Sequence, residues 1–255
     1  SNGYYLQDLA GDGDVRTSDA LLVFTGGVPG VGVGDVLEVT GTVTVFIPGG
    51  AASGNLSITE LVSPSSTLLG SAPLPAPTLI GAAGRVPPSE IIDDDAFADF
   101  DPELDGIDFF ESLEGMRVTL SDTRAVAGTN RFGELYTVVD QGSGATGLSL
   151  RGTLNISPRD FNPERIQIQV DAGVFPQMTP QVDTGARLGD ATGIVSYAFG
   201  NYEVLLSELL AVPTATGGCS ASVCRAMSKS PAWPVPTARR SSVRSSSSPT
   251  VRCSP

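Results

Sequence analysis

The stretch Gly-Asp-Val-Leu-Glu-Val-Thr-Gly-Thr-Val at residues 34–43, with Asn-Leu-Ser-Ile-Thr-Glu-Leu at residues 55–61, decides the fold of this chain. A related pattern returns as Gly-Asp-Ala-Thr-Gly-Ile-Val at 189–195 and Asn-Tyr-Glu-Val-Leu-Leu-Ser-Glu-Leu at 201–209. Each copy indicates a Gly-Asp turn, a strand, a loop and a closing strand. Because an internal repeat marks copies of one supersecondary unit, the sequence predicts two small β-modules in tandem.

The composition favours short strands and excludes several kinds of catalytic site. The 255 residues include 30 Gly and 19 Pro, which suit turns and interrupt long helices. There is no histidine, which excludes Ser-His-Asp and Cys-His catalysis and histidine as a metal ligand. Residues 1–210 also lack Cys and Lys. No apolar run approaches the roughly 20 residues that a membrane-spanning helix needs.

Charge is distributed unevenly along the chain. Residues 1–116 hold 2 Arg against 18 Asp and Glu, and residues 117–210 hold 7 Arg against 10 acids. Residues 211–255 carry 5 Arg, the single Lys and no acid. Because an acidic surface repels phosphate backbones, contact with nucleic acid would need a local Arg patch or bridging cations. A halophilic or marine extracellular setting would also explain the acidity.

The first predicted module spans residues 1–62, and residues 63–105 are predicted to form a linker. The expected strands of the first module are 4–8, 20–24, 36–46 and 55–62. Comparison with the second module predicts that the first lacks its opening strand, as it would in an N-terminally truncated chain. Residues 63–92 are rich in Ser, Pro, Gly and Ala and are followed by an acidic run, so the pattern predicts a Pro/Gly and acidic linker.

The second module spans residues 106–210 and begins with one short helix at 106–114, capped by Asp105 or Asp108. Its expected strands are 117–126, 134–140, 165–170, 191–196 and 202–206. Five short strands suit a small Greek-key barrel of the OB type, which commonly binds oligonucleotides or oligosaccharides. The predicted fold class is therefore all-β, with two OB-like barrels.

The C-terminal tail, residues 211–255, differs from the rest of the chain. It contains all three cysteines, Cys219, Cys224 and Cys253, and is dense in Ser, Pro and Arg. Without hydrophobic periodicity, this composition predicts disorder. The abrupt change is typical of a frameshift in GC-rich DNA, and a genuine basic tail is the alternative. The cysteines lack a histidine to complete a zinc site, so we expect no role for them.

The order of several motifs resembles a known group of proteins. Gly-Tyr-Tyr-Leu-Gln-Asp at 3–8, Gly-Asp-Gly-Asp at 11–14 and the stretch 33–43 are similar to the OB-like region of large secreted bacterial nucleases. Residues 106–116, 160–166 and 199–204 fit the same pattern, so the resemblance covers most of residues 3–206. In that family a catalytic domain of the endonuclease/exonuclease/phosphatase superfamily usually follows, with a divalent metal and two histidines. This chain has no histidine, so no catalytic residue is carried over.

The resemblance implies a non-catalytic accessory portion of an extracellular nuclease or phosphodiesterase. The implied partners are DNA or RNA and a downstream catalytic domain of the same parent chain, and the implied location is extracellular. A structural spacer, or a carbohydrate or adhesion module of a secreted protein, is the alternative that the acidity favours. An autonomous hydrolase with a carboxylate-held metal is a third hypothesis, and we expect no such activity.

Seven Arg of the second module lie among six aromatic residues in the sequence. Proteins that bind single strands use Arg for phosphates and aromatic rings to stack bases. Ordinary surface Arg and core aromatics are the alternative explanation. The contacts we expect for nucleic acid are Arg131, Phe132 and Tyr136, then Phe161 and Arg165.

Two acidic segments are candidate calcium sites, because hard cations prefer several carboxylate and carbonyl oxygens. The first contains Asp8, Asp12, Asp14 and Asp19 in a Gly-rich loop, for which a hairpin turn is the alternative. The second contains Asp101, Glu103 and Asp105, which match the start of a calcium loop, although Ser112 stands where a bidentate Glu is required. An acidic cluster that caps the following helix is the alternative there.

Overall fold

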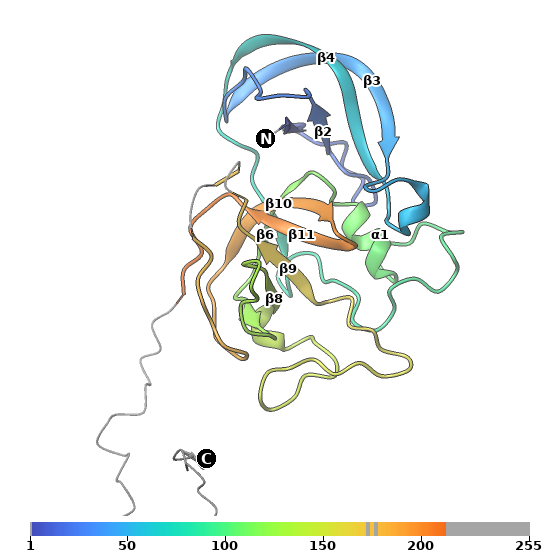
Figure 1. Ribbon diagram of the computed structural model, residues 1–255, viewed down its shortest axis with the longest axis vertical. Coiled ribbons are helices and arrows are strands. Elements are labelled where there is room, and N and C mark those ends of the chain that lie inside the picture. The colour runs from blue at the N-terminus through green and yellow to red at the C-terminus, as the bar shows by residue number, and fades with distance from the viewer. Residues whose placement is uncertain (1, 172–173, 176–177, 213–255) are drawn as a thin grey trace, which may run out of the picture. The chain divides into compact units, whose positions relative to one another are not determined.

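The protein is all-β, as the sequence predicts, with two sheets and one α-helix among the residues that the structure describes (Figure 1). The computed structural model describes residues 2–171, 174–175 and 178–212. The predicted disordered tail beyond residue 212, with its three cysteines, lies outside the described residues. None of the described helices is long and apolar enough to cross a membrane.

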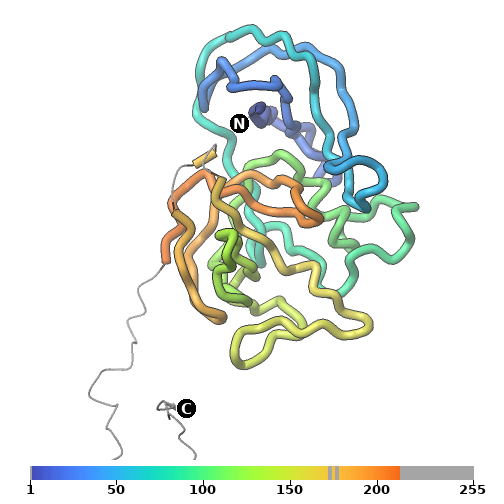
Figure 2. Tube along the Cα trace, in the orientation of Figure 1, coloured from blue at the N-terminus to red at the C-terminus, as the bar shows by residue number. Residues whose placement is uncertain are grey.

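The first sheet contains four strands in the order β1-β2-β4-β3. Pairs β1–β2 and β3–β4 are antiparallel, whereas β2 and β4 are parallel. Figure 2 follows this part of the chain from blue to cyan before it enters the second sheet. The strands are β1 (Gly3–Gln7), β2 (Ala20–Phe24), β3 (Asp35–Phe46) and β4 (Ile58–Ser71).

The second sheet contains seven strands in the order β5-β6-β10-β11-β9-β8-β7. Two pairs, β5–β6 and β9–β11, are parallel and the others are antiparallel. The strands are β5 (Thr78–Ile80), β6 (Arg117–Leu120), β7 (Arg124–Ala125), β8 (Leu135–Val138), β9 (Ile166–Gln169), β10 (Ala191–Ala198) and β11 (Asn201–Leu206).

The two sheets share one topology, which confirms the internal repeat. The run β8-β9-β11-β10 repeats β1-β2-β4-β3 in order and in strand direction. The two quoted sequence patterns form the corresponding hairpins, β3–β4 and β10–β11. The similarity in sequence therefore reflects a shared backbone arrangement.

Strands β6 and β7 provide the part that the first sheet lacks. Only residues 121–123 separate them, yet β6 pairs with β10 and β7 pairs with β8. The segment 117–125 therefore pairs with strands at both ends of the run β10-β11-β9-β8, as a closed barrel would require. The strand order is otherwise linear, so full barrel closure stays a prediction. Among the described residues, no counterpart of β6 or β7 flanks β1 or β3.

The predicted linker is wrong at two places. Strand β4 extends to Ser71, and β5 joins the second sheet beside β6. The Ser- and Pro-rich stretch can form a strand and pair with β3, because the hydrogen bonds between strands come from the backbone. Pro64, which has no N–H to donate, lies at a register shift where Ser63 and Pro64 face the single residue Gly41. A proline is tolerated in a strand at such a bulge.

The short helix α1 (Gly106–Glu111) ends three residues earlier than predicted. Asp105 occupies the N-cap position, but its side chain makes no capping hydrogen bond. The helix contributes Phe109 and Phe110 to the core of the second sheet. Gly106 is required by close packing, because a Cβ there would lie 2.3 Å from the Cβ of Pro163.

Candidate functional site

Tyr136 and Arg165 meet on the outer side of the second sheet. Leu135 and Thr137 are fully buried, so strand alternation turns Tyr136 to the opposite side of β8. Tyr136 pairs with Gln167 of β9, and Arg165 immediately precedes that strand. The Arg165 guanidinium lies 4.6 Å from the centre of the Tyr136 ring. The structure therefore joins two predicted contacts that are far apart in sequence.

Arg131 and Phe132 lie in the loop between β7 and β8. The Arg131 guanidinium is 4.6 Å from the centre of the Phe132 ring, which is 66% exposed. Asn130 fixes this loop, because its Oδ1 accepts hydrogen bonds from the backbone N–H groups of Phe132 at 2.9 Å and Glu134 at 3.0 Å. The pair is thus presented to solvent on an ordered turn.

Two other connections carry further exposed aromatic residues. Phe161, in the segment between β8 and β9, is 54% exposed, and its backbone N–H donates to the Glu90 carbonyl at 3.2 Å. Phe199, in the turn between β10 and β11, is 89% exposed and has a positive φ of 50°. The nucleic-acid contacts predicted from the sequence do not include Phe199. Its position beside Gly200 indicates a turn, which could have suggested that its ring is exposed.

A buried polar row crosses the same side of the sheet. Tyr136, Gln167, Glu203 and Ser196 are successive cross-strand neighbours. Gln167 Nε2 donates to Glu203 Oε2 at 2.8 Å, and each of the two residues is 4% exposed. Burial raises the pKa of Glu203 to about 7, with Glu134 and Asp171 adding repulsion and the Gln167 bond opposing the shift.

The end of this row reaches the first sheet. The hydroxyl of Tyr5, on β1, donates to Ser196 Oγ at 2.9 Å. Glu114 makes a second link, because its Oε1 accepts from the backbone N–H of Thr59 at 2.9 Å. Burial raises the pKa of Glu114 to about 7, against the effect of that hydrogen bond. The outer side of the second sheet is therefore partly occupied by the first module and partly exposed around Tyr136.

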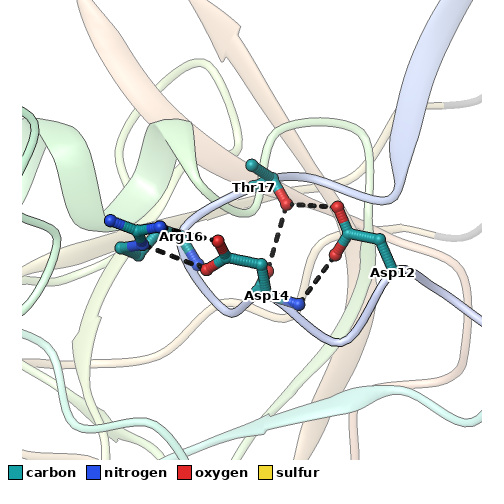
Figure 3. Close-up of polar contacts among 4 residues, drawn as sticks. All are labelled: Asp12, Asp14, Arg16 and Thr17. Atoms are coloured by element: carbon teal, nitrogen blue, oxygen red, sulfur yellow. Dashed lines mark hydrogen bonds and ion pairs between the residues drawn. The ribbon is translucent and has the colours of Figure 1, made fainter.

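The acidic loop between β1 and β2 is a network of local turns (Figure 3). Asp12 accepts from the Asp14 N–H and the Thr17 hydroxyl, each at 2.8 Å. Asp14 forms an ion pair with Arg16 at 2.8 Å, and the Arg16 hydrogen bonds lower the pKa of Asp14 to about 2.

The other two predicted calcium ligands of this loop also accept hydrogen bonds from nearby residues. Asp8 Oδ1 accepts from the backbone N–H of Ala10 at 2.8 Å, and Asp19 Oδ1 accepts from that of Asp12 at 3.0 Å. No three of these four carboxylates form a group with metal-ligand spacing. Calcium binding at this loop stays a prediction. The hydrogen bonds do not favour it, because they already occupy the carboxylate oxygens.

The second acidic segment does bring carboxylates together. One oxygen from each of Asp101, Asp105 and Asp108 lies within 4.8 Å of the others, and the same holds for Asp93, Asp95 and Asp105. Glu103, a predicted ligand, is exposed and belongs to neither group. The sequence pattern thus identified Asp101 and Asp105, two of the five clustered aspartates. The other three, Asp93, Asp95 and Asp108, join the cluster only because of how the loop folds.

A family of known sequences matches part of the chain. A family described as "Domain of unknown function (DUF8508)" matches residues 79–216. This region begins within β5, which agrees with the placement of β5 in the second sheet. No curated protein and no solved structure matches the chain.

Proposed function

The chain belongs to the DUF8508 family, and from the site in its second module we propose that this module binds single-stranded nucleic acid without catalysing its cleavage. In this proposal the chain is the accessory portion of a secreted nuclease or phosphodiesterase, and it positions substrate for a catalytic domain of the same parent protein. The chain has no histidine, so chemistry that uses histidine would come from elsewhere.

The observation that carries the proposal is the pairing of Arg165 with Tyr136 on the side of β8 and β9 that faces away from the core. In OB-type barrels, ligands bind on the second and third strands and in the loops beside them. Arg131 and Phe132 lie in the loop before the second strand, and Phe199 in the turn before the fifth. Cationic groups next to exposed rings suit a flexible phosphate backbone with stackable bases.

Electrostatics limit the strength expected of this binding. Glu134 lies beside Tyr136, whose hydroxyl donates to its Oε2 at 3.4 Å. The formal net charge of the chain is −13 at pH 7. We therefore expect weak binding that depends steeply on salt, with stacking supplying about 1–3 kcal/mol per base.

Fluorescence anisotropy with labelled single-stranded and duplex oligonucleotides at two salt concentrations tests the proposal. We expect the single strand to be preferred. Phe132→Ala should weaken its binding at least fivefold, because a lost base stack is worth about 1–3 kcal/mol. Arg131→Ala together with Arg165→Ala should reduce the salt slope by about 0.7 for each phosphate that the protein no longer neutralises.

Arg16→Ala is the matched control, because it removes one positive charge from the first module and should leave the affinity within twofold. An equal loss for each charge removed, in the control and in the Arg131→Ala/Arg165→Ala variant, would mean that the arginine effect is one of net charge. If the chain binds no oligonucleotide but binds glycans, the carbohydrate-module alternative replaces this proposal.

A further inference from the structure

Backbone hydrogen bonds close the acidic segment into a loop. The N–H of Gly106 donates to the Ile91 carbonyl at 3.1 Å, and the N–H of Ile107 donates to the Ile92 carbonyl at 3.0 Å. The entry to the loop and its exit into α1 are therefore side by side. This closure brings together carboxylates separated by up to fifteen positions, namely Asp93, Asp95, Asp101, Asp105 and Asp108.

Asp105 is the common member of both carboxylate groups. Its side chain is 1% exposed, and its Oδ1 is buried without any hydrogen-bond partner. Its Oδ2 has a long contact, 3.3 Å, from the Asp94 N–H. Asp101 Oδ1 is buried without a partner as well. A buried carboxylate oxygen without a donor or a cation is costly, so this arrangement points to a missing positive ligand.

No side chain in residues 2–171, 174–175 and 178–212 forms an ion pair with this loop. The two ion pairs in the described part of the chain are Arg16–Asp14 and Arg117–Glu208, and neither includes a residue of this loop. The charge of Arg85 interacts with the exposed Glu103, and its Nη2 donates to Ser112. Among the described residues, the clustered aspartates therefore have no ion-paired counterion.

The chemistry of the ligands identifies the class of cation. The oxygens in each group of three lie within 4.8 Å of one another, which is close enough to share one ion. All of them belong to carboxylates, which calcium binds at about 2.3–2.6 Å in flexible geometry. Magnesium, at about 2.0–2.1 Å, demands a tighter octahedron, and zinc prefers nitrogen and sulfur ligands that this loop lacks.

We propose that the loop 93–108 is a calcium site with Asp105 as its central ligand and Asp101 and Asp108 completing the more buried group. Asp93 and Asp95 extend the site on the other side of Asp105. The ion neutralises the buried carboxylates and ties the loop to α1, which carries Phe109 and Phe110 into the core. The calcium proposal does not depend on the proposed nucleic-acid binding.

Calorimetric titration of the chelator-treated full chain with calcium chloride, in about 150 mM salt to screen diffuse attraction, tests the site. We expect saturable binding, and a melting temperature that rises with calcium because the ligand binds the folded state. Magnesium chloride at equal concentration should give a smaller rise. Asp105→Asn should weaken calcium binding at least tenfold. Glu103→Gln, in the same segment and with the same change in charge, should stay within twofold.

The melting temperatures of the two variants also distinguish calcium binding at a specific site from nonspecific attraction of calcium to acidic residues. Without calcium, Asp105→Asn should melt at or above the unsubstituted chain, because it removes a buried unpaired charge. With calcium, it should lose most of the rise that the unsubstituted chain shows. Asp101→Asn is the second variant if Asp105→Asn fails to fold, with the same expected loss. No saturable binding, or equal losses in Glu103→Gln and the aspartate variants, would overturn the proposal.

Discussion

Phe109→Ala is expected to lower the free energy of unfolding by about 3–5 kcal/mol, the cost of truncating a buried aromatic. The Phe109 side chain is 2% exposed and lies edge-on to Phe110, with ring centres 5.2 Å apart. Phe110 in turn stacks on Tyr202 of β11 at 5.6 Å. The Arg85 guanidinium covers the Phe109 ring at 5.0 Å. The cavity would therefore open between α1 and the sheet it covers.

Urea denaturation followed by circular dichroism measures this loss. Phe132→Ala is the matched control, because it removes the same atoms from a ring that is 66% exposed. Its effect on stability should stay within about 0.5 kcal/mol, as for surface substitutions in general. A similar loss of stability in both variants would contradict the assignment of Phe109 to the core and Phe132 to the surface. The control also shows that any binding defect of Phe132→Ala is not one of folding.

Glu203→Gln is expected to stabilise the protein above pH 7 and to have little effect near pH 5. Burial raises the pKa of Glu203 from 4.5 to about 7, so the folded state holds a proton that the unfolded state releases between these values. Stability therefore falls as pH rises through this range and levels off above it. At about 1.4 kcal/mol per pKa unit, the variant should gain on the order of 3 kcal/mol at pH 8.

Unfolding free energies at pH 5, 6, 7 and 8 measure this difference. Burial also raises the pKa values of Glu114 and Glu164 to about 7, but both groups are present in either protein and cancel in the comparison. Glu38→Gln, at an exposed position of β3, should give a difference that varies little with pH. If Glu203→Gln is less stable at every pH, the hydrogen bond from Gln167 outweighs the buried charge and the expectation fails.

The local sequence determined most of the strands and one half of the proposed nucleic-acid face. The sequence predicted β8–β11 within a few positions, because short strand-forming stretches between turn residues are local signals. Arg131 and Phe132 are adjacent in sequence, so their contact needed only an ordered turn. The sequence did not predict the full length of β4. Its Ser- and Pro-rich part is held by backbone hydrogen bonds, which cannot be inferred from amino-acid composition.

Contacts between distant residues were decided only by the tertiary structure. Tyr136 and Arg165 meet because β8 pairs with β9. Glu203 has a raised pKa because the fold buries its side chain away from water. The aspartates at 93–108 converge because backbone bonds from Gly106 and Ile107 close the loop. Local patterns are set by neighbouring residues, whereas these pairings follow from strand register and loop closure, which bring distant segments together in space.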